Sequence, residues 1–90
     1  MPKITVAPRE EDWYLVTVRE GETSTTHQVH LTPEYLARYA TPQTSPEQLL
    51  HASFEFLLQH EPKESILPSF ELPLIEQYFP NYPSQIRNQL

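Results

Sequence analysis

The fold of this chain is decided between Ser45 and Tyr82, where the sequence reads S-P-E-Q-L-L-H-A-S-F-E-F-L-L-Q-H-E-P-K-E-S-I-L-P-S-F-E-L-P-L-I-E-Q-Y-F-P-N-Y. The stretch opens with a helix-start pattern. The Ser45 hydroxyl can accept a hydrogen bond from a free amide of the first turn, Pro46 needs no amide partner, and Gln48 completes a capping box. It contains no recognisable arrangement of catalytic residues. The stretch therefore indicates how the chain buries a core, but it does not indicate the function of the protein.

The helix predicted over residues 46–60 is too apolar to lie on the surface. On a 3.6-residue period its polar side chains fall on one narrow face, and apolar side chains cover most of the remaining circumference. The polar face comprises Gln48, His51, Glu55 and Gln59, and the apolar positions are Leu49, Leu50, Phe54, Phe56, Leu57 and Leu58. We expect a central helix, packed against a sheet on one flank and against C-terminal segments on the other. Pro62 ends it, because a residue before proline is disfavoured in the helical conformation.

The N-terminal residues 1–31 are predicted to form strands. Apolar residues alternate in a short first strand around residues 4–6, and residues 13–18 (W-Y-L-V-T-V) are β-branched and aromatic. Gly21 separates that run from a second β-branched run, residues 23–31, at a point where a hairpin needs a residue that accepts a positive φ. We expect an antiparallel meander of three strands. The continuous apolar run suggests that strand 13–18 is covered on both faces, or nearly so.

Two registers of this hairpin are compatible with the sequence. A two- or four-residue loop places the even-numbered residues of 14–18 opposite Val29 and the other odd-numbered residues. A three-residue loop instead places Trp13 and Leu15 opposite Val29 and His27. The choice matters because a slip of one residue turns every side chain of a strand to the other face.

The remaining helices are predicted to be short and separated by prolines. The first runs over residues 33–40, with Thr32 as its N-cap and a proline at its first position. Beyond the central helix, we expect a further helical turn, a short helix and a last helix at the C-terminal end. These occupy residues 63–67, 74–79 and 84–90.

The composition is that of one folded domain. Of the 90 residues, 38% are hydrophobic and 20% are charged, and the ten prolines are spread along the chain at predicted element boundaries. A chain of this length forms a single core. The sequence predicts one α+β domain over residues 1–90, strand-rich in 1–31 and helical in 32–90. An antiparallel hairpin or three-stranded meander packs in it against short helices around one central buried helix.

The chain is acidic, with a formal net charge of −6 at pH 7. Its six lysines and arginines are scattered singly, whereas nucleic-acid binders need a cluster of positive charge that faces phosphates. We therefore expect no binding to nucleic acid, and the charge leaves a basic protein partner open. The sequence has no cysteine, no apolar run long enough to span a membrane and no signal-peptide pattern at its start. Together these features predict a cytoplasmic protein that does not bind a membrane.

No set of side chains in the sequence predicts catalysis or metal binding. His27 and His30 are three residues apart in a predicted strand, so they point to opposite faces. His51 and Glu55 have the i, i+4 spacing of a surface ion pair, and two ligands are too few for a metal site. The four glutamates of residues 61–76 offer carboxylates for acid–base chemistry, but exposed glutamate in solvated turns is the ordinary interpretation. We expect no catalytic residue, no cofactor and no metal.

The aromatic residues near the C-terminal end have two interpretations. They either close the core over the central helix, which is the commoner role, or lie partly exposed as an interface. The set comprises Phe70, Tyr78, Phe79 and Tyr82. Phe79 is expected to be the buried anchor, because it follows Ile75 by four residues on the same helix. Tyr78 and Tyr82 form the candidate interaction surface, and Tyr82 is expected to be an exposed contact whose hydroxyl tolerates water.

The central part of the chain resembles a family of short bacterial proteins of uncharacterised function. The pattern F-x-F-L-L-x-x-E-x-x-E-S-I-L, here residues 54–67, is followed by I-x-x-Y-F-P, here residues 75–80. The similarity extends over most of the chain, including its strand-rich start. It implies a bacterial origin and transfers no catalytic or binding residue.

These observations favour an interaction protein over an enzyme. We interpret the chain as a non-catalytic regulatory or adaptor module, whose partner is a second copy of itself in a homodimer or another protein. The alternative is a binder of a small molecule or a metal in a cleft between the sheet and the central helix.

Overall fold

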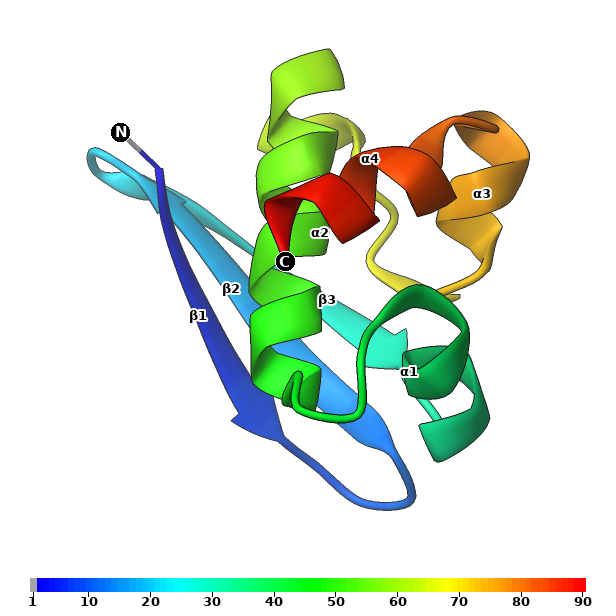
Figure 1. Cartoon of the computed structure of the whole chain (residues 1–90). Coiled ribbons are helices and arrows are strands. Elements are labelled where there is room, and N and C mark those ends of the chain that lie inside the picture. Colours follow the sequence, from blue (N-terminus) through cyan, green and yellow to red (C-terminus); the bar gives the residue numbers. More distant parts are fainter. Residues whose placement is uncertain (1) are drawn as a thin grey trace.

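A four-stranded sheet forms one layer of the molecule, and the helices form the other (Figure 1). The structure is a computed structural model and describes residues 2–90. The strands follow the order β1-β2-β3-β4 across the sheet: β1 (Lys3–Pro8), β2 (Trp13–Glu20), β3 (Thr23–His30) and β4 (Ser69–Glu71).

The helices lie on one side of this sheet, as predicted for an α+β fold. In chain order they are α1 (Pro33–Tyr39), α2 (Pro46–His60), the 3-10 turn η1 (Lys63–Ser65), α3 (Leu74–Tyr78) and α4 (Tyr82–Gln89). Capping side chains begin two of them. The Thr32 hydroxyl accepts a hydrogen bond from the amide of Tyr35 at 3.2 Å. At the start of α2, Ser45 and Gln48 form both bonds of the predicted capping box, at 3.1 and 2.8 Å.

The N-terminal meander forms with a two-residue hairpin loop, which gives the first of the two registers considered. β1 pairs antiparallel with β2, and β2 pairs antiparallel with β3. Glu20 lies opposite Thr23, which leaves a two-residue loop that begins at Gly21. Gly21 has a φ of 60°, and glycine is favoured at this first loop position because it adopts positive φ without strain. The register therefore pairs Tyr14 with Val29.

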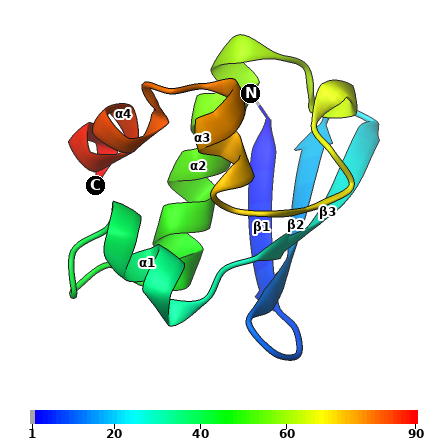
Figure 2. The same cartoon turned by 90° about the vertical axis from the view of Figure 1, so that its right-hand side faces the viewer.

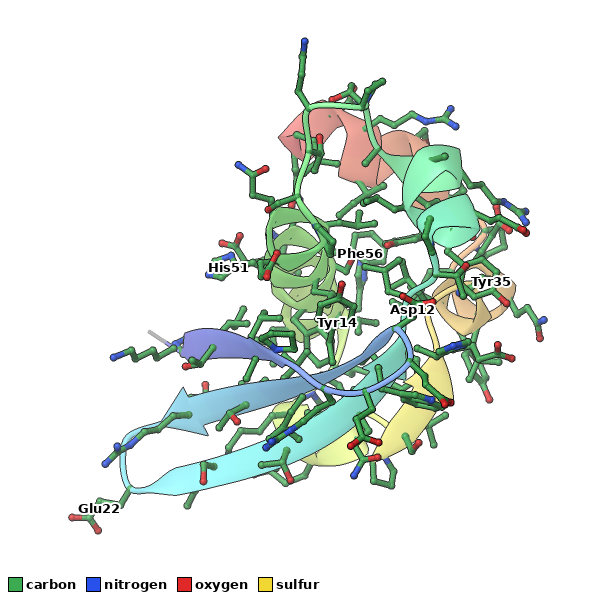
Figure 3. The ribbon with its side chains drawn as sticks, turned by 90° about the horizontal axis from the view of Figure 1, so that it is seen from below. Asp12, Tyr14, Glu22, Tyr35, His51 and Phe56 are labelled. Atoms are coloured by element: carbon green, nitrogen blue, oxygen red, sulfur yellow. The ribbon has the colours of Figure 1, made fainter. Side chains whose placement is uncertain are left out.

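This register turns one face of the sheet toward the helices and leaves the other open. Figure 3 shows Tyr14 on the helix side of the sheet and Glu22 at the exposed tip of the hairpin. The expectation that strand 13–18 is covered on both faces is wrong. No helix or strand among residues 2–90 covers its second face, where Trp13, Leu15 and Thr17 are half-buried by neighbouring side chains. The Trp13 ring, for example, lies 4.9 Å from the His30 ring.

A fourth strand, which the sequence pattern does not predict, extends the sheet beyond β3. β4 pairs parallel with β3. The amide of Gln28 donates to the carbonyl of Pro68 at 2.8 Å, and the amide of Leu72 donates to the carbonyl of His30 at 3.0 Å. The three residues of β4 are too few to show a strand period, so only the pairing with β3 defines this strand.

The central helix α2 lies between the sheet and the later helices, as predicted (Figure 2). Its polar face is exposed throughout. Its buried side chains are Leu49, Leu50, Ala52, Ser53, Phe54, Phe56 and Leu57, whereas Leu58 is half-buried. The core thus consists of the inner sheet face, most of the α2 surface and the inner faces of α1, α3 and α4.

Candidate functional site

An apolar pocket of about 370 Å³ opens where four segments meet: the end of α2, the turn after η1, β4 and α3. Its floor is built from side chains that are part of the core. These are Leu57, Ile66, Phe70 and Ile75, each between 3 and 8% exposed. The floor is therefore held by the same packing that stabilises the fold.

The rim of the pocket carries apolar side chains that reach solvent. Tyr78 is 67% exposed and Leu67 is 43% exposed. Among residues 2–90, the one other large hydrophobic side chain with comparable exposure is Leu90. An isolated exposed aromatic residue is ordinary, but an exposed tyrosine beside an apolar pocket has the composition of a binding surface.

Besides the hydroxyl of Tyr78, the polar groups of the lining are the carboxylate of Glu61 and the hydroxyl of Ser65. Two neighbouring glutamates are already paired. Glu64 bonds the Lys63 ammonium, and Glu76 accepts a bond from Arg38 at 2.7 Å. Among the described residues, no ion pair involves Glu61. The pocket thus presents one uncompensated negative charge in a mainly apolar lining.

Two interactions hold the wall of the pocket between η1 and β4. His27, buried in β3, donates from Nδ1 to the carbonyl oxygen of Leu67 at 2.8 Å, and its Nε2 lies 2.8 Å from the Thr25 hydroxyl. Burial lowers the pKa of His27, and its bond to Leu67 offsets this in part. Lys63 is buried as well and lies 3.7 Å from a carboxylate oxygen of Glu20. The hairpin side of the sheet therefore supports the segment that forms this wall.

The two aromatic positions that were proposed as an interaction surface have opposite environments. Tyr78 is exposed at the pocket, whereas Tyr82 is 0% exposed, so the expectation that Tyr82 is a surface contact is wrong. The last helix begins at Tyr82, two residues earlier than predicted, and this directs the ring toward α2. There its hydroxyl bonds Ser53 at 2.6 Å, while Ser53 donates to the carbonyl of Leu49 at 2.7 Å. Burial raises the pKa of Tyr82.

Phe79 is also placed differently from the expectation. It is half-buried, and on α3 the fully buried position is that of Ile75. The Phe79 ring stacks on His60 at 5.0 Å and meets Phe56 edge-on at 5.6 Å. The turn after Tyr78 therefore lays Phe79 across the end of α2, where it forms part of the pocket wall.

Of the histidines and glutamates singled out in the sequence, Glu61 lines the pocket and the others do not gather there. His27 and His30 point to opposite faces, as predicted. His30 lies 3.2 Å from a Glu71 carboxylate oxygen, and the Tyr35 hydroxyl donates to the same oxygen at 3.1 Å. Both bonds lower the pKa of Glu71, that from His30 the more. His51 and Glu55 form the predicted surface pair at 3.1 Å.

No metal centre is apparent in the described part of the chain. Residues 2–90 contain no group of three or more histidine, aspartate or glutamate side chains placed to hold one ion. The same residues include no helix that is both long enough and apolar enough to cross a bilayer.

Comparisons of the chain with family models, with curated proteins and with solved structures found no match. The candidate site therefore has to be interpreted from its own chemistry. The two patterns quoted above, over residues 54–67 and 75–80, supply every lining residue of the pocket except Phe70 and Leu74. Two patterns that the sequence separates thus converge on one surface feature.

Proposed function

We propose that this protein is a non-catalytic interaction module that binds a partner protein at the apolar pocket, with Tyr78 as the exposed anchor on the rim. The observation that carries the proposal is the 67% exposure of Tyr78 beside a pocket lined mainly by hydrophobic side chains. Tyrosine is enriched among the residues that dominate binding energy, and such residues seat in well-packed pockets. A regulatory or adaptor role in the bacterial cytoplasm is consistent with the resemblance and with the absence of cysteine.

Burial of the rim would supply the binding energy. Covering apolar surface stabilises a complex by about 25 cal/mol per Å², and a tyrosine ring contributes a large apolar area at a low cost in side-chain entropy. The acidic composition, with a net charge of −6, favours a basic partner through faster association and complementary charge. The lining contains no histidine or lysine that could activate Ser65 as a nucleophile, so the pocket chemistry favours binding over catalysis.

A photo-crosslinking side chain placed at position 78 tests this proposal in cells of the natural host. We expect a discrete crosslinked species from position 78. The matched control is position 26, where Thr26 is exposed on β3 on the opposite sheet face and should give no such species. The species should also weaken when Leu67, on the same rim, is changed to serine. Equal crosslinking from both positions, or none from position 78, would contradict the proposal.

A small apolar ligand is the second candidate for the pocket. Its volume of about 370 Å³ lies at the lower end of the range for small-molecule sites, roughly 300–1,000 Å³. Glu61 and Ser65 would then orient a polar group of the ligand. Native mass spectrometry of protein purified from its natural host should show a stoichiometric added mass if this candidate is right, and the bare chain mass if the pocket serves a protein partner.

A further inference from the structure

One outer edge of the sheet, that of β4, lies beside the pocket. β4 is the last strand in the sheet order, so within residues 2–90 no strand lies beyond its outer edge. Successive residues of a strand direct their backbone groups to alternate edges. The Pro68 carbonyl and the Leu72 amide both bond β3, and Phe70, between them, therefore faces β3 as well. The backbone groups of Ser69 and Glu71 consequently point to the free edge.

The residues that carry these edge groups lie at the surface. Ser69 and Glu71 are exposed, as are the two residues before them. Within residues 2–90, no backbone hydrogen bond outside the regular strand pairing involves the Ser69 or Glu71 amide, and these amides point away from β3. In Figure 2 the yellow segment that contains β4 leads from η1 past β3 into α3. The edge thus presents two amides and two carbonyls, and an added strand would form its backbone hydrogen bonds with such groups.

The pocket lies on the side of this edge to which Phe70 points. Phe70 lines the pocket, whereas the Glu71 side chain lies on the open face with His30 and Tyr35. A strand added to β4 would lie about 4.8 Å away, with its side chains alternating between the same two faces. Side chains on one face would enter the pocket between Phe70 and Tyr78. Those on the other face would lie next to the Glu71 carboxylate.

The charge around this edge favours a basic segment over a second copy of the chain as its binding partner. The Glu71 side chain is 60% exposed beside the edge, and Glu61 lines the pocket. A second copy of this chain would bring another net charge of −6 and place like carboxylates near one another. A segment with lysine or arginine at the positions beside Glu71 would form opposite-charge cross-strand pairs instead.

We propose that the partner, whose binding rests on the function proposed above, contributes an extended segment in which apolar residues alternate with lysine or arginine. This segment adds to the free edge of β4 as a fifth strand. Its apolar side chains fill the pocket, its backbone bonds Ser69 and Glu71, and its basic side chains pair with Glu71. Main-chain bonds supply affinity, and the pocket supplies specificity.

A synthetic heptapeptide in which lysine alternates with valine and leucine is the probe. Titration into the isotope-labelled protein should slow hydrogen exchange at the Ser69 and Glu71 amides and shift the signals of Tyr78. Ser69→Pro removes an edge amide that β3 does not use, and edge strands tolerate proline at such positions. It should weaken binding about tenfold, whereas Ser69→Ala, which keeps the amide, should leave binding unchanged.

Two control peptides test the inference without altering the protein. In the first peptide, the backbone amides that would bond β4 are N-methylated. In the second, glutamate replaces lysine. Both should bind at least about tenfold more weakly than the original peptide. Binding at the pocket that is indifferent to Ser69→Pro and to N-methylation would overturn strand addition while leaving the proposed function intact. If the peptide does not bind although position 78 crosslinks specifically, the inference that the partner contributes an alternating basic segment is wrong. Concentration-dependent shifts of Ser69 and Glu71 without peptide would identify a second copy as the occupant instead, and failure of the crosslinking would remove the proposed function itself.

Discussion

At the scale of single residues, two buried tyrosines differ in whether their hydroxyl groups form a hydrogen bond. Tyr39 and Tyr82 are both 0% exposed, and their rings lie 5.1 Å apart. The Tyr82 hydroxyl bonds Ser53, whereas the Tyr39 hydroxyl is buried without a hydrogen-bond partner among the described residues. Burying a hydroxyl costs free energy unless a hydrogen bond compensates it. The two tyrosines therefore differ in what their hydroxyls contribute.

We predict opposite effects when each of these tyrosines is changed to phenylalanine. Tyr82→Phe should lower the free energy of unfolding by about 1 kcal/mol, because it removes a buried hydrogen bond and leaves Ser53 with one partner fewer. Tyr39→Phe should be neutral or slightly stabilising, since the lost hydroxyl makes no bond. Urea titrations of both variants and the wild type measure this. Equal destabilisation would show that Tyr39 has a hydrogen-bond partner in solution.

A second residue-scale prediction concerns pH and His27. Burial lowers the pKa of His27 below the ordinary value of 6.5, so the unfolded chain takes up this proton at a higher pH than the folded chain. Its stabilising contribution is therefore full above about pH 6.5 and is lost as the pH falls toward the folded pKa. We expect a smaller free energy of unfolding at pH 5.5 than at pH 7.5.

A matched variant isolates the contribution of His27. His27→Gln does not titrate, so it should lose much of the difference between pH 7.5 and pH 5.5, although it starts from a lower stability. The pKa values of Glu64 and Glu71 are lowered from 4.5, by Lys63 and by His30 respectively, so their contributions are lost at lower pH, outside this window. An unchanged pH dependence in His27→Gln would assign the effect to other groups.

At the scale of the element, α2 carries the core on most of its surface. Phe54 is 0% exposed and faces the sheet, with its ring 5.3 Å from His27 and 6.2 Å from Phe70. Gln59, on the same helix, is exposed. The helix therefore tolerates change on one narrow face and resists it on the others.

Substitutions on the two faces of α2 should differ severalfold in their cost. Phe54→Ala should lower the free energy of unfolding by about 3–5 kcal/mol, because it removes a buried ring and leaves a cavity. Gln59→Ala, as the control on the same helix, should stay within about 0.5 kcal/mol of the wild type. Chemical denaturation followed by circular dichroism measures both. Similar values for the two variants would contradict the assignment of these faces.

At the scale of the whole molecule, the layered arrangement places the candidate site at a junction. The pocket is lined by α2, the segment after η1, β4 and α3, so Leu57 of its floor and Phe79 of its wall come from separate segments of the chain. Its floor belongs to the core, and its rim reaches solvent through Tyr78 and Leu67. The free edge of β4 borders the same pocket, so one side of the molecule offers both backbone bonding groups and an apolar recess. This combination makes that side the binding face in our proposals.

The sequence by itself determined the local features of this protein. Capping patterns at Thr32 and Ser45 predicted where two helices begin, and a 3.6-residue period predicted the faces of α2. Gly21 indicated the hairpin turn. These features could be read because short-range hydrogen bonds and side-chain periodicity depend on residues within a turn or two of one another.

Only the tertiary structure decided how distant segments meet. β4 exists because β3 supplies its pairing partners, and no period within residues 69–71 indicates a strand. The burial of Tyr82 depends on the start of α4 and on Ser53, a residue 29 positions earlier in the chain. The sequence identified Tyr78 as a candidate contact, but its position beside a pocket depends on the chain after α3, where Phe79 packs against Phe56 and His60 at the end of α2. Burial and pocket formation depend on long-range contacts. Local propensity does not encode these contacts, because the same aromatic residue can lie in a core or on a surface.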